Sequence, residues 1–145
     1  LIQSAVDHPQ ISFRGRFDNK QVSRVLSEMD VLVVPSIWYE NAPLTMNEAA
    51  MTQTPIIASD RGGMLEFVRA NHWGRTFKLG DADALARVMR DLICHPDEIA
   101  SLIGTQPYIK PVEANADELA GYYERLVGGR PITQSSPLVP SATRA

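Results

Sequence analysis

Two short runs of purely apolar residues, 31–34 (Val-Leu-Val-Val) and 55–58 (Pro-Ile-Ile-Ala), place the strongest constraint on how this chain can fold. A strand without a polar side must be covered on both faces, as the strands of buried parallel sheets are. Amphipathic stretches with apolar residues at helical spacing lie at 18–29, at 43–53 and after Asp81. This alternation of strand and helix with short connections predicts an α/β fold, a parallel sheet with helices on both faces.

The remaining predicted elements are shorter. Strands are expected at 11–13 and 75–78, and further helices at 64–70, 97–103 and 114–127. About four strands can be counted, whereas doubly wound sheets commonly have five or six. The chain also opens inside an apolar pattern without a helix cap. We therefore expect a fold that is incomplete at its N-terminal side, with an open sheet edge through which the chain self-associates.

Composition divides the chain into three parts. We predict a domain over residues 1–108 and a connector with a terminal amphipathic helix over residues 109–127. Residues 128–145 are rich in glycine, proline, serine and threonine and have little to bury, so a disordered tail is expected there.

Charge and cysteine usage exclude several classes of function. The formal net charge is -3 and no run rich in lysine and arginine is present, which argues against nucleic-acid partners. The single cysteine, Cys94, excludes an internal disulfide and a cysteine-rich zinc site. No apolar stretch of about 18 residues suggests a transmembrane segment, and no signal peptide opens the chain. We expect a cytoplasmic protein.

Two glutamates flank the start of the helix expected at 43–53. Glu40 lies in the loop that follows the run 31–34, and Glu48 lies about a turn and a half inside the helix, with its side chain leaning back toward the N-terminus. Ligands of open α/β sheets bind at this carboxyl end of the strands. Both carboxylates therefore face one end of the helix, where the first N–H groups have no intrahelical acceptor.

The first-turn amides of Leu44, Thr45 and Met46 form the candidate anion site between the two acids. Glu48 shares a stripe with Leu44 and Met51, so it is expected on the apolar side, where a carboxylate needs hydrogen-bond donors such as sugar hydroxyls. The alternative is that both glutamates only offset the positive end of the helix dipole.

Several motifs in order along the chain are similar to those of one enzyme family. Glu40 and Glu48 form an E-x(7)-E pair, which resembles the signature of the retaining glycosyltransferases called group 1. The surrounding motifs resemble the same family and extend the likeness over about residues 10–95: Phe13-Arg14-Gly15, residues 27–36, residues 54–59, Gly62-Gly63 with Glu66, Gly74, and residues 80–86. The resemblance implies the C-terminal half of a GT-B fold, a Rossmann-like domain that binds a nucleotide-sugar donor.

The resemblance also implies roles for individual residues. Glu40 and Glu48 become the candidate catalytic residues: Glu48 would bind the ribose hydroxyls and Glu40 would bind hydroxyls of the transferred sugar. The amides of Leu44 and Thr45 would hold donor phosphate or sugar oxygens. The other implied donor-binding residues are Asn41 and Ala42, which follow Glu40, and Arg16, Phe17 and Asp18, which would lie against the base, with Lys20 as a weaker candidate.

This sequence departs from the family pattern in two places. Pro43 stands where many relatives have glycine, which removes one N–H donor from the motif. The basic pair that neutralises the leaving diphosphate in the family is not found upstream of Gly15. We therefore expect a truncated donor half that is inactive by itself.

For the full-length protein the resemblance implies transfer of a sugar from a UDP-, GDP- or ADP-linked donor to an acceptor, with retention of configuration. Polysaccharide or glycolipid synthesis is the expected setting, in the cytoplasm or peripherally at the inner face of the membrane. No carboxylate cluster suggests a magnesium site, so neither a metal nor a cofactor is expected. Two alternatives remain open: a sugar-nucleotide epimerase of the same architecture, and a non-catalytic nucleotide-binding or interaction module.

Overall fold

The structure is a computed structural model that describes residues 8–41, 43–104 and 107–128. The chain forms two compact units, residues 1–109 and residues 110–145. The predicted disordered tail, apart from Gly128, lies outside the described residues.

A three-stranded parallel sheet forms the centre of the larger unit. Its strands are β1 (Leu32–Val34), β2 (Ile56–Ser59) and β3 (Arg75–Phe77), in the order β1-β2-β3. All four residues of the central strand β2 are buried, as expected for a strand that is apolar on both sides. The predicted parallel sheet is confirmed.

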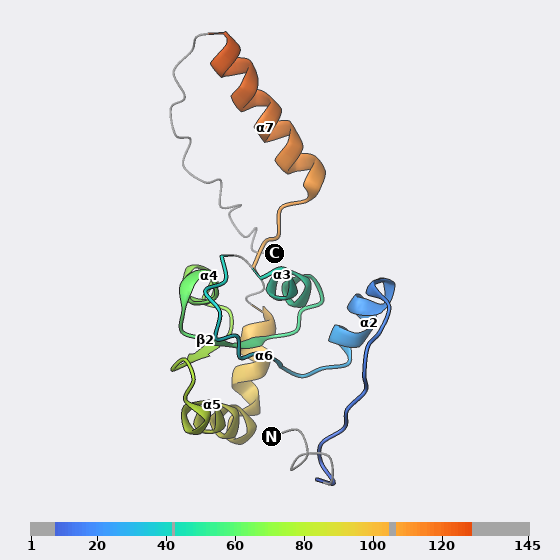
Figure 1. Ribbon diagram of the computed structural model, residues 1–145, viewed down its shortest axis with the longest axis vertical. Coiled ribbons are helices and arrows are strands. Elements are labelled where there is room, and N and C mark those ends of the chain that lie inside the picture. Colours follow the sequence, from blue (N-terminus) through green and yellow to red (C-terminus); the bar gives the residue numbers. More distant parts are fainter. Residues whose placement is uncertain (1–7, 42, 105–106, 129–145) are drawn as a thin grey trace. The chain divides into compact units, whose positions relative to one another are not determined.

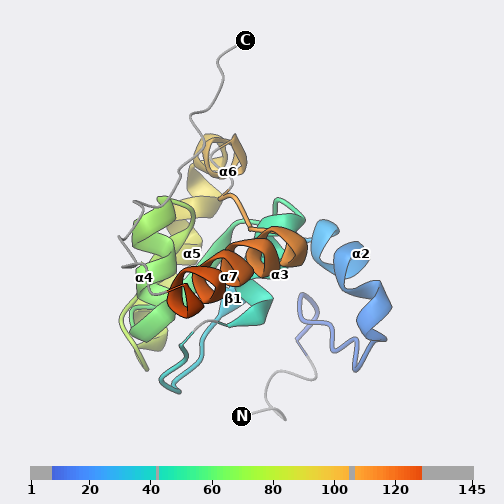
Figure 2. The ribbon, with the colours of Figure 1, turned by 90° about the horizontal axis from the view of Figure 1, so that it is seen from above.

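Helices cover both faces of this sheet. They are α2 (Val22–Ser27), preceded by the 3-10 turn η1 (Asn19–Gln21), then α3 (Leu44–Met51), α4 (Gly62–Asn71), α5 (Ala82–Cys94) and α6 (Pro96–Gly104). Figure 1 shows α3 and α4 on one side of β2 and α5 on the other. In the view of Figure 2, α2 lies beside α3, with which it is in contact.

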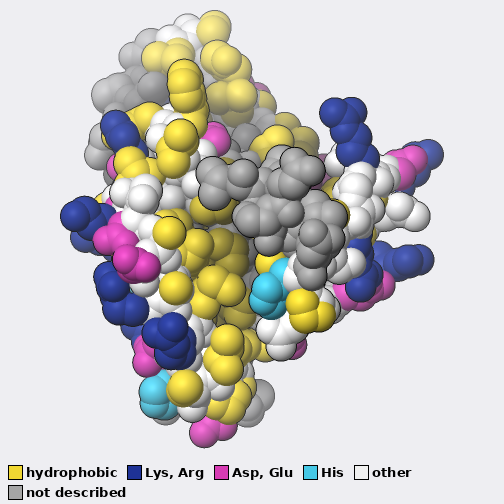
Figure 3. Space-filling view, turned by 60° about the horizontal axis from the view of Figure 1, so that its bottom comes forward, with side chains coloured by type: hydrophobic (Ala, Val, Ile, Leu, Met, Phe, Trp, Pro, Cys, Tyr) yellow, Lys and Arg dark blue, Asp and Glu magenta, His cyan; other side chains and the backbone are white. Residues whose placement is uncertain are grey.

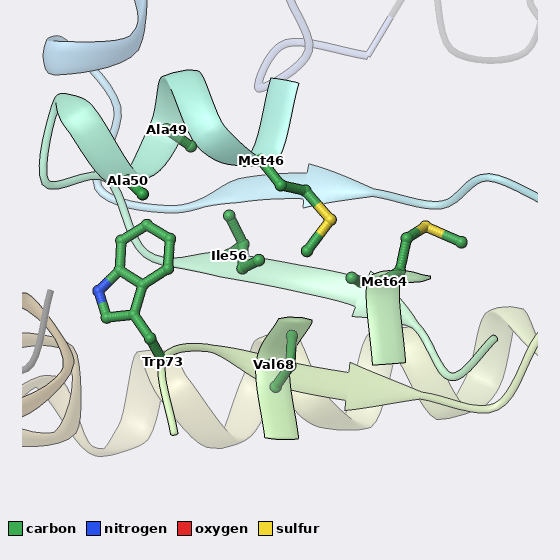
Figure 4. Close-up of a cluster of buried hydrophobic side chains, with 8 residues drawn as sticks. Met46, Ala49, Ala50, Ile56, Met64, Val68 and Trp73 are labelled. Atoms are coloured by element: carbon green, nitrogen blue, oxygen red, sulfur yellow. The ribbon is translucent and has the colours of Figure 1, made fainter. Parts of the chain in front are cut away.

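The main core lies between β2 and the helix pair α3 and α4. Its members come from α3, β2, α4 and the turn before β3: Met46, Ala49, Ala50, Ile56, Ala58, Met64, Val68 and Trp73. Figure 4 shows the side chains of α3 pointing toward Ile56, with the Trp73 ring close to Ala50. The side chains of Ala49 and Ala50 are small, so α3 can lie close to the sheet and the core between them is packed without a void.

A second, smaller core lies on the opposite face, where Ile57, Phe77 and Leu92 are buried. Beside it an apolar groove runs between the segment leading into β1 and the helices α5 and α6, lined in part by Met29, Val31 and Ile93. Figure 3, in which the bottom of the Figure 1 view comes forward, shows a band of hydrophobic side chains along this face. This face of the unit is therefore only partly covered by the described residues.

Two sequence predictions about strands are wrong. Residues 11–13 form no strand: they are exposed and lie outside the described sheet, and the Ile11 N–H donates to the nearby His8 carbonyl at 3.0 Å. The described part of the chain thus has three strands rather than four. The run at β1 is half-buried rather than buried, because in the described residues it is the outer strand and its face above the groove is open. The periodicity of a sequence does not indicate which segments will pair with a neighbouring strand.

The smaller unit contains the helix α7 (Val112–Val127), which matches the predicted terminal helix to within two residues at its start. Glu118 accepts a hydrogen bond from the Tyr122 hydroxyl at 3.2 Å and forms an ion pair with Lys110. The hydrogen bond from Lys110 holds the pKa of the Glu118 carboxyl below its ordinary value. None of the described helices in either unit is both long enough and apolar enough to cross a membrane.

Candidate active site

The loop that carries Glu40 follows β1, and a hydrogen bond within the loop holds the Glu40 carboxylate in place. The Ser36 hydroxyl donates to Oε1 of Glu40 at 3.2 Å, and the same hydroxyl oxygen accepts the Trp38 N–H at 3.3 Å. Glu40 is half-buried. Its carboxylate therefore keeps acceptor capacity on the solvent side while one oxygen is held by the loop.

A second contact fixes the main chain of Glu40. Its carbonyl accepts the N–H of Gly63, in the first turn of α4, at 2.9 Å. The Arg61 guanidinium lies over the ring of Tyr39, 5.5 Å from the ring centroid. The sequence indicates Gly62 and Gly63 only as part of a motif that resembles the family, and does not predict these contacts to the acidic loop. The signal in the sequence is a pair of glycines separated by two residues from the end of a buried strand, and this pattern does not identify the segment that the glycines contact.

Glu48 lies in the second turn of α3 and is half-buried. The prediction that it lies on the apolar side of the helix is wrong. Its stripe neighbours Leu44 and Met51 are 75% and 68% exposed, because α3 buries its opposite face against the sheet. Among the described residues no hydrogen bond or ion pair occupies the Glu48 carboxylate, whereas its main-chain carbonyl accepts from Thr52.

The start of α3, which lies between the two acids along the chain, supplies backbone donors. Pro43 is the N-cap with extended backbone, and the helix begins at Leu44. The N–H of Met46 donates to the Pro43 carbonyl at 3.0 Å, so the expectation that this amide is unpaired is wrong. The N–H groups of Leu44 and Thr45 have no acceptor among the residues that the structure describes. They remain available to an anion.

The other predicted site residues are less closely connected to the two acids. Asn41 is exposed in the loop after Glu40, and Ala42 lies outside the described residues. Arg16, Phe17 and Asp18 are exposed in a segment without regular structure, and no described hydrogen bond or ion pair joins them to the acidic loop. Asp18 caps η1 and accepts the Lys20 N–H at 2.9 Å, a local structural role.

Thus both acids and the two amides belong to one stretch of the chain, the loop after β1 and the first two turns of α3. Within the described ranges no group of three or more histidine, cysteine, aspartate or glutamate residues is arranged to hold a metal ion.

Comparison with known proteins gives concordant matches. Residues 1–95 match the sequence profile of the family described as Glycosyl transferases group 1. Over 87 residues the chain is 36% identical to D-inositol 3-phosphate glycosyltransferase of Streptomyces coelicolor, covering 60% of this chain and 19% of the relative. Over 75 residues it is 29% identical to the amylovoran biosynthesis glycosyltransferase AmsK of Erwinia amylovora, covering 48% of this chain and 18% of the relative.

A solved structure, sucrose-phosphate synthase from Thermosynechococcus elongatus, aligns with a TM-score of 0.70 and 28% identity, over 83% of this chain and 31% of that chain. It supports a Rossmann-like α/β fold. The chain therefore spans less than a fifth of the two curated relatives and about a third of the solved structure.

Proposed function

The chain belongs to the group 1 glycosyltransferases, and on this premise we propose that its larger unit binds the nucleotide-sugar donor through Glu40 and Glu48. The observation that carries the proposal is that two half-buried acids, Glu40 and Glu48, stand on either side along the chain of the Leu44 and Thr45 amides, which have no acceptor among the described residues. An ionised carboxylate accepts hydrogen bonds only, so its natural ligands are hydroxyl groups. Amides at a helix N-terminus favour phosphate oxygens.

The roles follow from this chemistry. Glu48 accepts hydrogen bonds from the ribose hydroxyls, and Glu40 accepts them from hydroxyls of the sugar to be transferred. The backbone N–H groups of Leu44 and Thr45 donate hydrogen bonds to phosphate or sugar oxygens of the nucleotide sugar. Arg16, Phe17 and Asp18 form the loop against the base, an assignment supported only by the order of motifs.

In the whole protein the reaction breaks the bond between the anomeric carbon and the diphosphate, and the sugar passes to an acceptor hydroxyl with retained configuration. Charge develops on the diphosphate, where fixed amides and cationic side chains stabilise it. We propose that no metal ion or other cofactor takes part. The Erwinia amylovora relative is named as a biosynthesis glycosyltransferase, and we propose that the whole protein acts in polysaccharide or glycolipid synthesis, with the cytoplasm as its location.

The chain by itself is proposed to transfer no sugar. The basic pair of the family is not found upstream of Gly15, so the leaving diphosphate lacks those two partners. Incubation of the purified chain with radiolabelled donor sugars and hydroxyl acceptors is expected to give no product. Measurable transfer by the pure chain would contradict the proposal.

We also propose that the chain self-associates along β1. In the part that the structure describes, β2 pairs with one side of β1 and no strand pairs with the other. Light scattering is expected to detect species heavier than the 16.0 kDa chain. A monodisperse monomer at high concentration would contradict this idea.

Calorimetric titration with UDP, GDP and ADP tests donor binding. We expect one nucleotide to bind preferentially, near millimolar affinity, which corresponds to about −4 kcal/mol. Glu48→Gln retains the shape of the side chain, removes the charge, and is expected to weaken that nucleotide about tenfold, as the loss of a charged hydrogen bond does.

The matched control is Glu28→Gln, which makes the same charge change at the exposed C-cap of α2. It is expected to leave the affinity unchanged, and circular dichroism verifies that each variant is folded. Equal affinities of the Glu48→Gln variant and the unmodified chain would refute the role of Glu48. The non-catalytic module with a different ligand would then be favoured.

A further inference from the structure

We propose that Arg61, Gly62 and Gly63, at the start of α4, are positioning residues that hold Glu40 in the geometry needed to bind the donor sugar. The inference rests on the proposed function of Glu40 and assigns no ligand contact to the three residues themselves. These residues lie at the start of α4, more than twenty positions after Glu40 in the sequence.

The first support is the hydrogen bond from the Gly63 N–H to the Glu40 carbonyl, 2.9 Å long. The first N–H groups of a helix have no partner inside the helix. The Gly63 N–H instead finds its acceptor in the main-chain carbonyl of Glu40, the proposed sugar-binding residue. With Ser36 holding the carboxylate, Glu40 is fixed at both its backbone and its side chain.

The second support is the close approach that only glycine allows at position 62. A Cβ there would lie 2.7 Å from the carbonyl oxygen of Glu40 and 3.3 Å from Cε1 of Tyr39. The first of these neighbours is backbone, which cannot rotate aside as the end of a flexible side chain can. Gly62 also has φ +52°, in the left-handed region that favours glycine. Any larger residue would push the Glu40 main chain away from α4.

The third support is the cation–π contact between Arg61 and Tyr39, the residue before Glu40. Tyr39 is 66% exposed and Trp38 is 74% exposed, and among the described residues only Tyr39 of the two makes a cation–π contact. This contact ties the side chain of Tyr39, the residue before Glu40, to the start of α4.

The test compares two glycine-to-alanine substitutions in the 145-residue chain. Gly62→Ala introduces both backbone strain and the clash with Glu40, whereas Gly80→Ala introduces a similar strain at φ +73° with nothing within 4 Å of the new Cβ. Amide hydrogen exchange of Gly63 is the first readout. We expect Gly62→Ala to abolish its protection while the amides of β2 stay protected, and Gly80→Ala to leave Gly63 unchanged. Retained protection of Gly63 in the Gly62→Ala variant overturns the proposal.

The second readout is the ratio of the affinity for a nucleotide sugar to that for the nucleotide alone. UDP-glucose is compared with UDP, GDP-mannose with GDP, and ADP-glucose with ADP. Since Glu48 stays in place, Gly62→Ala is expected to lower this ratio about tenfold, the effect of losing one hydrogen bond to a charged group, and Gly80→Ala is expected to leave it unchanged.

Glu40→Gln separates failure of the inference from failure of the proposed function. If this substitution leaves the ratio unchanged, the sugar-binding role of Glu40 is wrong. If it lowers the ratio and Gly62→Ala does not, only the positioning role is wrong. In the Glu40→Gln background Gly62→Ala should lower the ratio no further. Should Gly62→Ala fail to fold, Arg61→Met, which removes the guanidinium without a new Cβ, is measured in the same way and should increase the exchange rate of Gly63.

Discussion

Thr54 ties α2 to the beginning of β2 through a hydroxyl group buried in the protein. It is 2% exposed, and its hydroxyl donates to the carbonyl of Leu26 at 2.9 Å. Thr54→Val removes this hydrogen bond while keeping the shape and β-branching of the side chain. Because α2 packs beside α3, the loss loosens the contact between the two helices.

The neighbouring groups set the magnitude of the effect. The Leu26 carbonyl also accepts the N–H groups of Glu28 and of Met29, the latter at 3.0 Å, so it keeps backbone partners when the hydroxyl is removed. The Thr52 hydroxyl, 3.0 Å from that of Thr54, can still donate to the carbonyls of Glu48 or Ala49. Thr54→Val therefore costs the net value of one buried hydrogen bond, about 1–1.5 kcal/mol of unfolding free energy, rather than the full penalty of an unpaired polar group.

Urea unfolding followed by circular dichroism measures this loss, with Thr76→Val as the matched control. Thr76 is half-buried in β3, and its hydroxyl has no hydrogen bond among the described residues, so its replacement should change stability by no more than about 0.5 kcal/mol. An equal unfolding free energy for the two variants would refute the assignment of the Thr54 hydrogen bond.

Three further outcomes are expected. Gly74→Ala should destabilise the chain by about 3 kcal/mol or more, because φ is +109° and a Cβ would lie 2.5 Å from the Ile56 carbonyl; Gly80→Ala should cost only about 1 kcal/mol in the same urea titration. The hydrogen bond from Arg75 lowers the pKa of the Glu98 carboxyl, so the pair stabilises the fold above the ordinary carboxyl pKa and less as the pH falls through the lowered value. Glu98→Gln should therefore reduce stability at pH 7 by less than about 1 kcal/mol, and the difference from the unmodified chain should vanish in acid. Nucleotide affinity measured by calorimetry should be the same with and without EDTA, and its loss on chelation would contradict metal independence.

The elements with the strongest periodicity could be predicted from the sequence. The apolar run at β2 and the stripe of α5 lead directly to the observed strand and helix, and Asp81 caps α5 by accepting the Ala84 N–H at 2.8 Å. These features depend on residues close together in the chain. Local propensity and burial agree there, so the pattern is sufficient.

Strand pairing and helix orientation could not be predicted in the same way. Residues 11–13 have the composition of a strand, but a strand needs a neighbour to satisfy its backbone groups. In α3 two stripes compete for the sheet. The smaller residues Ala49 and Ala50 are buried and Leu44 is exposed, because close approach of the helix outweighs the size of a single apolar side chain.

For the candidate site, the two acids and the helix start are visible in the sequence, whereas the support from α4 is not. The contact between Gly63 and Glu40 joins residues that no local pattern connects. Only the path of the chain around β2 brings them together.

The two tryptophans occupy opposite environments, and this gives the protein two optical signals. Trp73 is fully buried in the main core with its ring edge against Phe67, whereas Trp38 is 74% exposed beside Glu40. Emission from Trp73 should lie at short wavelength and shift to the red only when the core opens. Emission from Trp38 should be quenched readily by acrylamide and respond to events at the acidic loop. The Trp73→Phe and Trp38→Phe variants would each leave one of the two emission signals. Unfolding of the core and ligand binding at the acidic loop could then be followed separately by fluorescence.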